Sequence, residues 1–188
     1  DEDVLPAALA LEVFHNFTLL HDDVMDKADV RRGRPTVHGK WNDNTAILSG
    51  DQMLIEAYKL LSGVSADKLP KVLKLFNQMA TEICEGQQYD VDFETQEQVT
   101  IEEYLKMIRL KTAVLLATAL KMGSCIAGAS TEQQDMLYEF EVGMDDYGYL
   151  EDGFNDWTTF DASNDGRNHP WWHSSRSMSH SVESAGES

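Results

Sequence analysis

The stretch that decides the fold is residues 4–26, VLPAALALEVFHNFTLLHDDVMD, where a long apolar segment ends in three aspartates. Between residues 5 and 25, apolar side chains recur on every side of a helical wheel, and Pro6 is tolerated in the first turn of a helix. A helix that is apolar all round belongs in a core. We therefore predict a central, buried helix whose C-terminal end is polar.

Outward from this helix, the sequence predicts further helices and no sheet. Residues 27–36 are polar and contain Gly33 and Pro35, which is typical of a loop. Helical spacing of apolar residues follows over residues 42–61, 69–89, 101–109, 112–127 and 131–142. Thr100 and Glu103 form a capping-box pattern at the start of one of them. No segment shows sustained period-two alternation, so we expect an all-α fold.

Composition and charge exclude some classes of function. The chain has 188 residues and a formal net charge of −18, which disfavours a protein that tracks nucleic-acid phosphates. It opens on acidic residues, with no basic and apolar leader, and its nearest candidate for a membrane span, residues 112–129, is interrupted by Lys121. We therefore expect a cytoplasmic protein that binds no nucleic acid and has no transmembrane segment.

The composition changes near Met144. The last 45 residues contain no Lys and no Ile but hold three of the four Trp, so they lack the aliphatic stripe that packs a helix. We predict two parts: a helical domain over residues 1–143 and a diverged, poorly ordered segment over residues 144–188.

The polar end of the first helix carries the chemistry. Asp22 and Asp26 are four residues apart, so their carboxylates share one helical face and repel each other. A hard divalent cation such as Mg²⁺ would relieve this repulsion, whereas the alternative is a solvated acidic helix end. His15 shares the same face, and Arg31 and Arg32 follow in the loop. Because guanidinium groups grip phosphate oxygens, the pattern favours a diphosphate site.

The order of these motifs resembles the trans-isoprenyl diphosphate synthases, also called polyprenyl synthetases. The resemblance covers residues 7–143 and implies a bundle of antiparallel helices of the isoprenoid synthase type. The matching motifs are DDxxD at Asp22, Asp23 and Asp26, then Arg31-Arg32-Gly33, Gly50-Asp51, Gly86-Gln87 with Asp90, and Lys111-Thr112.

The resemblance also implies roles for these residues. Asp22 and Asp26 would bind Mg²⁺ that bridges to an allylic diphosphate, with Asp23 in support and Asp90 near the metal. The allylic diphosphate would be contacted by Arg31, Gln87, Lys111 and Thr112, and isopentenyl diphosphate by Arg32 and His15. The catalytic set is then Asp22, Asp26 and Lys111.

The implied activity is a prenyl transfer that condenses an allylic diphosphate with isopentenyl diphosphate. A bulky Phe17 beside the smaller Thr18, just before DDxxD, resembles enzymes that stop at farnesyl or geranylgeranyl diphosphate. The resemblance further implies a homodimer.

Two motifs of the family are not recognisable here. Nothing like its N-terminal Gly-Lys-x-x-Arg segment precedes Asp22, and its second aspartate-rich motif is replaced by a stretch with Asp145 and Asp146. These two aspartates are a candidate for a displaced metal motif, although Gly148 and Gly153 disfavour a helix there. We therefore expect an N-terminally truncated, incomplete bundle. A class I terpene cyclase and a non-catalytic diphosphate-binding or regulatory subunit remain the alternatives.

Overall fold

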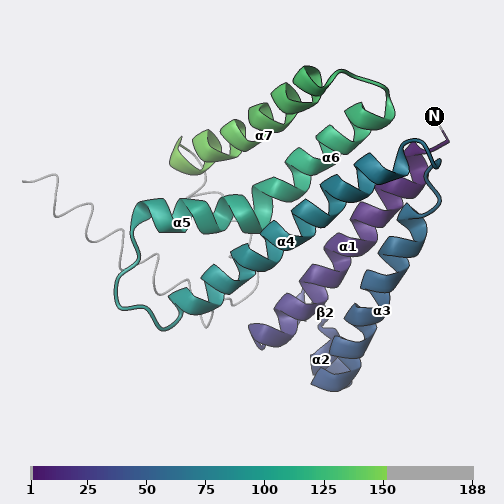
Figure 1. Cartoon of the computed structure of the whole chain (residues 1–188). Helices are drawn as coiled ribbons and strands as arrows, with labels where there is room; N and C mark the ends of the chain where they lie inside the picture. Colours follow the sequence, from purple (N-terminus) through teal and green to yellow (C-terminus); the bar gives the residue numbers. More distant parts are fainter. Residues whose placement is uncertain (1, 152–188) are drawn as a thin grey trace, which may run out of the picture.

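The computed structural model describes residues 2–151, and it describes side chains up to residue 143. The regular secondary structure of this part of the chain is helical apart from one small hairpin, which confirms the all-α prediction (Figure 1). The helices are α1 (Val4–Met25), α2 (Val37–Lys40), α3 (Asp43–Leu61), α4 (Leu69–Phe93), α5 (Ile101–Ile108), the π-helical turn η1 (Arg109–Ala113), α6 (Val114–Ile126) and α7 (Thr131–Glu151). The hairpin pairs β1 (Val30–Arg31) with β2 (Arg34–Pro35) in antiparallel register.

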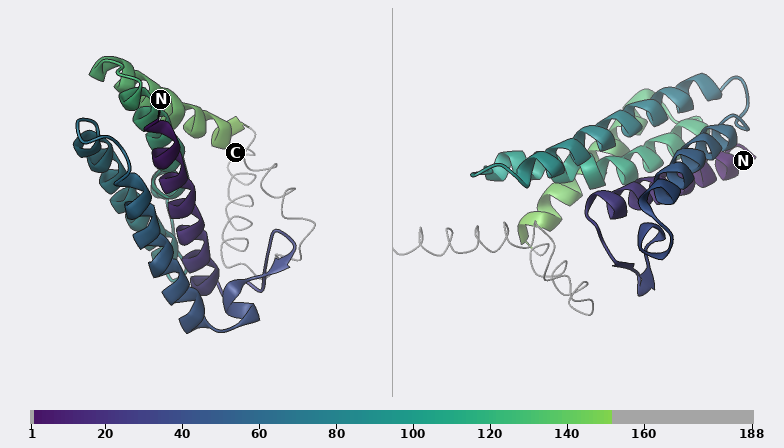
Figure 2. Two further views of the ribbon diagram at one scale, coloured as in Figure 1. Left: turned by 90° about the vertical axis from the view of Figure 1, so that its right-hand side faces the viewer. Right: turned by 90° about the horizontal axis from the view of Figure 1, so that it is seen from below.

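The long helices form an antiparallel bundle around α1. Helix α1 packs against α3 and also contacts α6, while α4 packs against α6 and η1. Helix α7 lies along α6 at the edge of the bundle (Figure 1). The hairpin projects beyond the C-terminal end of α1 (Figure 2). The arrangement brings the polar end of α1, the hairpin and the C-terminal half of α4 into one region.

A row of aromatic rings runs through the core toward the polar end of α1. Tyr58 packs on Phe76, and Phe76 packs on Phe14, each at 5.2 Å between ring centroids. The row continues from Phe14 to Phe17 at 5.5 Å and from Phe17 to the ring of His21 at 4.7 Å. Phe14 and Phe76 are fully buried. Tilted and edge-on rings contribute beyond their buried area, so this row ties α1, α3 and α4 together.

The opposite end of α1 is fixed by Asp3. Its carboxylate accepts hydrogen bonds from the backbone N–H and the hydroxyl of Ser65, both at 2.8 Å, and pairs with Lys68 at 3.0 Å. The hydrogen bonds from Lys68 and Ser65 lower the pKa of Asp3 to about 2. The start of α1 is therefore attached to the connection between α3 and α4.

Most predicted helices are confirmed, with shifted ends. Helix α3 begins after Asn42, whose side chain accepts from the N–H of Thr45, and the capping box of Thr100 and Glu103 is present. Helix α4 runs to Phe93, four residues beyond the predicted end at residue 89. The sequence obscured this end because Asp90 and Asp92 interrupt the apolar spacing in the last turn.

Three local predictions are wrong. The stretch over residues 27–36 contains the two short strands, and the helix α2 that follows was not predicted. The two helices expected over residues 101–109 and 112–127 are one continuous helical segment, because η1 joins α5 to α6.

Helix α7 continues past the predicted end at residue 142 to Glu151, so residue 148 is helical despite being glycine. Glycine costs only about 1 kcal/mol in a helix, a small penalty for a helix that has already formed on its N-terminal side. The two-part division at residue 143 stays a prediction. Most of its second part lies outside the described residues.

Helix α1 is long and apolar enough to span a membrane by length and composition. This result corrects the expectation that residues 112–129 are the nearest candidate. An apolar core helix passes the same test, and α1 packs against α3 and α6 and ends in ion pairs to two other elements. The prediction of a helix buried on every side is nevertheless wrong for this structure, because only 17% of the apolar window is buried: Ala7, Ala10 and Phe14 face the core, whereas Val4, Leu5 and Leu9 are exposed.

Candidate functional site

The polar end of α1 is closed by a Schellman motif. The N–H of Ala28 donates to the carbonyl oxygen of Asp23 at 3.0 Å, and that of Lys27 donates to Val24 at 3.4 Å. Lys27 adopts a positive φ of 53°, the left-handed conformation that this motif requires. The motif reverses the chain after Asp26 and returns the hairpin toward the aspartates it has just left.

Arg31 on β1 makes that return contact. Its Nε donates to Asp23 at 2.6 Å and its Nη2 donates to Asp22 at 3.2 Å. The side chain of Asp23 is only 8% exposed, and burial raises its pKa although the Arg31 guanidinium opposes the shift. Asp23 is therefore the buried anchor of Arg31, while Asp22 lies at the edge of the pair.

Lys111 approaches the same aspartate from the other side. Its Nζ lies 3.0 Å from a carboxylate oxygen of Asp22 and 2.6 Å from one of Asp90. Burial alone would lower the pKa of Lys111, but the carboxylates of Asp22 and Asp90 outweigh it and raise the pKa. A charged ammonium thus bridges carboxylates from α1 and α4.

A backbone contact places Lys111 at this point. A Cβ atom on Gly86 would lie 2.5 Å from the backbone N of Lys111 and 2.8 Å from the carbonyl carbon of Leu110. Only glycine allows α4 and η1 to approach this closely. Asp90 follows Gly86 by one turn on the same face of α4, so the contact sets Lys111 beside it.

His21 is a residue that the sequence reasoning missed. Its Nε2–H donates to the carbonyl oxygen of Ile47 on α3 at 3.0 Å, and Asp51 lies 3.7 Å away. Its ring rests on Gly50, where any Cβ would collide with it. The Gly50-Asp51 motif was the available signal, since it marks a place where α3 receives another element closely. His21 fixes the position of the neighbouring Asp22.

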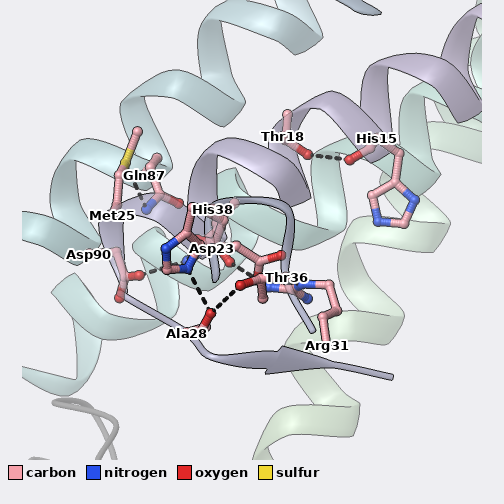
Figure 3. A network of polar contacts seen from close by, with 12 residues as sticks. His15, Thr18, Asp23, Met25, Ala28, Arg31, Thr36, His38, Gln87 and Asp90 are labelled. Carbon is pink, nitrogen blue, oxygen red and sulfur yellow. Dashed lines mark hydrogen bonds and ion pairs between the residues drawn. The ribbon is translucent and has the colours of Figure 1, made fainter. Parts of the chain in front are cut away.

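Thr36 and His38 were also missed, and they hold the loop under the end of α1 (Figure 3). The Thr36 hydroxyl donates to the carbonyl oxygen of Ala28 at 2.7 Å and caps α2 by accepting from Gly39. His38 Nε2 lies 2.7 Å from the same carbonyl oxygen. Thr before a helical turn is a capping signal that the sequence contained.

A cleft of about 470 Å³ opens between α1 and the hairpin, beside the ion-paired cluster. Three arginines of the hairpin line it: Arg31, Arg32 and Arg34. Apolar side chains complete its wall, among them Leu19 and Leu20 of α1. Cationic groups beside an apolar wall suit an anionic ligand that has an apolar tail.

The structure brings some of the predicted site residues together and leaves others apart. Asp22, Asp23, Asp90, Arg31 and Lys111 form one network, and the amide of Gln87 lies beside it, 3.7 Å from the sulfur of Met25.

Figure 3 shows that His15 lies nearer the N-terminal end of α1, away from Asp23, Arg31 and Asp90. Arg32 and Thr112 are exposed, and Asp26 is half-buried at the C-cap of α1. Asp145 and Asp146 lie on the backbone of α7, and their side chains are outside the described residues.

The carboxylates of Asp22 and Asp90 are the type of ligand that a divalent metal ion such as Mg²⁺ prefers. Among the residues whose side chains are described, no three His, Cys, Asp or Glu side chains converge as a metal site. Asp22 and Asp90 do converge on one cation, the Lys111 ammonium. Carboxylate oxygens are the ligands that Mg²⁺ prefers, and it commonly takes only one or two of them.

An antiparallel bundle with paired aspartates and cations at the end of its central helix defines an all-α protein of the isoprenoid synthase type. The family model described as "Polyprenyl synthetase" matches residues 1–152. The chain therefore belongs to the polyprenyl synthetase family.

Known relatives agree with this assignment. A geranylgeranyl diphosphate synthase of Methanosarcina mazei is 49% identical over 139 residues, covering 73% of this chain and 43% of that protein. A short chain isoprenyl diphosphate synthase of Methanocaldococcus jannaschii is 44% identical over 140 residues, covering 74% and 42%. The chain thus spans less than half the length of these curated relatives.

Solved structures give the same result. A crystal structure of a geranylgeranyl pyrophosphate synthase matches with a TM-score of 0.73 and 53% identity, covering 78% of this chain and 47% of that one. A geranylgeranyl pyrophosphate synthetase from Pyrococcus horikoshii matches with a TM-score of 0.71 and 38% identity, covering 74% and 43%.

We predict that Gly86→Ala destabilises the protein by about 1–3 kcal/mol, since the new methyl group must push the backbones of α4 and η1 apart. Gly123→Ala is the matched control, because nothing lies within 4 Å of a Cβ there. The control should gain up to about 1 kcal/mol from helix propensity. Denaturant unfolding measures both, and equal effects of the two substitutions would contradict the close contact at Gly86.

Proposed function

We propose that this chain catalyses prenyl transfer. It would join an allylic diphosphate to isopentenyl diphosphate and give a short-chain product such as farnesyl or geranylgeranyl diphosphate. The observation that carries the proposal is the convergence of Lys111 and Arg31 on Asp22. Two cations beside a carboxylate support the binding of a metal-bound diphosphate. The names of the relatives support the same activity.

The first step breaks the bond between the allylic carbon and the diphosphate oxygen, leaving a carbocation and pyrophosphate. Lys111 and Arg31 would stabilise the charge that develops on the departing pyrophosphate. Asp22, Asp26 and Asp90 would hold Mg²⁺, which when bound supplies Lewis-acid charge at those oxygens.

The second substrate would place its diphosphate near Arg32 and Arg34 in the cleft. Its double bond then attacks the carbocation, a carbon–carbon bond forms, and a proton leaves to the released pyrophosphate. The apolar side chains of Leu19 and Leu20, which line the cleft, would help to exclude water that otherwise captures the cation. A terpene cyclase needs only one diphosphate, so the arginine-lined cleft favours a transferase.

A second candidate is a non-catalytic diphosphate-binding or regulatory subunit. The observation in its favour is that no three metal-ligating side chains converge within the part of the chain whose side chains are described. Such a subunit would keep the Lys111 and Arg31 contacts but would not ionise the substrate.

We predict that Asp22→Asn weakens Mg²⁺-dependent binding of pyrophosphate by about 1–3 kcal/mol, the scale of a lost charge-assisted contact. Calorimetry measures binding, and geranyl diphosphate with labelled isopentenyl diphosphate and Mg²⁺ tests turnover. Asp67→Asn is the control, because Asp67 is exposed in the loop before α4.

Elongated prenyl products from the unaltered chain would support the transferase. A cyclised hydrocarbon would indicate a terpene cyclase, and binding without turnover would indicate the non-catalytic subunit. Unchanged, metal-independent pyrophosphate binding in Asp22→Asn would reject the role of this aspartate.

Phe17 and Thr18 are proposed to limit product length. Phe17 is half-buried one turn before His21, and Thr18 lies one turn before Asp22. A growing chain whose diphosphate is held at Asp22 would extend along α1 past this turn. We predict that Phe17→Ala lengthens the products seen by chromatography, since it removes a ring from the path. Identical product lengths from both proteins would mean that Phe17 is only a core residue.

We also propose a cytoplasmic homodimer. Ile47, Leu48 and Ile55 leave apolar surface exposed on α3, and Leu48 is 68% exposed. A helix that is apolar on more than one face needs a partner for each face. Light scattering should therefore give about twice the mass of the 21.2 kDa chain. A stable monomer at high concentration would contradict the proposal.

A further inference from the structure

In this structure, side chains that are proposed to bind the metal form ion pairs with a side chain that is proposed to bind the diphosphate. Asp22 and Asp90, proposed to hold the metal, both contact the ammonium of Lys111, which is proposed to contact the diphosphate. The side chains of Asp22 and Asp90 are each 16% exposed, so their charges are only weakly screened by water.

We propose that the Lys111 ammonium occupies the position of the metal ion in the ligand-free chain, where it joins Asp22 to Asp90. When the metal and the diphosphate bind together, the ammonium moves from the carboxylates to the diphosphate. The inference rests on the proposed function, because it takes these aspartates as metal ligands. Its consequence is that metal and diphosphate bind as one coupled event, each poorly without the other.

Charge accounts for the coupling. Mg²⁺ alone would displace the Lys111 ammonium from Asp22 and Asp90 and leave it facing a divalent cation. Diphosphate alone would draw Lys111 away, which would take this counter-charge from Asp90 and leave Asp22 with only its Arg31 contact, an unfavourable arrangement for carboxylates that are mostly buried. When both ligands enter, the carboxylates pair with the metal and Lys111 pairs with the anion, so every charge has a partner.

The geometry assigns the exchange to Lys111 rather than to Arg31. Arg31 is held through Nε by the buried Asp23, which would be left unpaired if Arg31 moved. The backbone of Lys111 is fixed against Gly86, but its side chain has four methylene groups and rotatable donors. The exchange therefore requires rotation of one side chain and no movement of a helix.

The test is a calorimetric Mg²⁺ titration without any anion. Lys111→Met removes the charge and keeps an unbranched side chain that is one atom shorter, and the variant should bind Mg²⁺ about 10-fold more tightly than the unaltered protein. Lys106→Met is the matched control, because Lys106 is exposed and its Nζ contacts the Tyr89 hydroxyl at 2.7 Å. The control should bind Mg²⁺ as the unaltered chain does.

The sign of the effect should reverse when an anion is present. With saturating inorganic pyrophosphate, Lys111→Met should bind Mg²⁺ about 10-fold more weakly, since the anion then lacks its cationic partner. Unchanged or weaker Mg²⁺ binding by Lys111→Met without pyrophosphate overturns the inference alone. No Mg²⁺ binding by either protein, with or without pyrophosphate, overturns the proposed metal site as well.

A second measurement uses the unaltered chain, so it does not depend on the folding of a variant. An amine-acetylating reagent followed by mass spectrometry reports how accessible each lysine Nζ is. Saturating Mg²⁺ alone should raise the acetylation rate of Lys111 several-fold relative to Lys106, because the metal releases the ammonium from its carboxylates. An unchanged ratio of the two rates overturns the inference.

Discussion

The ammonium of Lys111, held between the carboxylates of Asp22 and Asp90, is the interaction on which the arrangement of the site depends. It joins α1, α4 and η1 at one point, and it requires each of them to be placed accurately. Gly86 allows the necessary approach of α4 and η1, and His21 seats the end of α1 on α3. The packing of these elements thus brings opposite charges within hydrogen-bonding distance of one another.

The sequence predicted the helices well because apolar spacing, caps and glycine stops are local signals. It also named Asp22, Arg31 and Lys111 as candidate site residues, and these three side chains are in contact, whereas Asp26 is the C-cap residue of α1. Their roles in binding and catalysis stay predictions. It could not predict the hairpin, because two-residue strands have no periodicity to detect. The pairing of these cations with Asp22, Asp23 and Asp90 was also hidden, since tertiary packing decides which opposite charges meet.

The three aspartates of DDxxD show why a motif alone does not assign roles. Asp23 is buried and holds Arg31, Asp22 is shared between Arg31 and Lys111, and Asp26 caps the end of α1. The letters of the motif are identical, yet burial and partners differ at each position. A reaction that requires a carboxylate able to change its cationic partner can use Asp22, whereas Asp23 stays paired with Arg31 of the hairpin.

The π-helical turn η1 works as a phase shift. A turn that spans one extra residue rotates everything after it by about 100° relative to an uninterrupted α-helix. Helices α5 and α6 are therefore continuous through η1, but their buried positions follow different helical phases, which is why the sequence looked like two separate helices. A chain one residue shorter in Arg109–Ala113 would still be helical, but it would have to follow either the phase of α5 or that of α6. The direction of Lys111 is thus encoded by the number of residues in this turn as well as by the lysine itself.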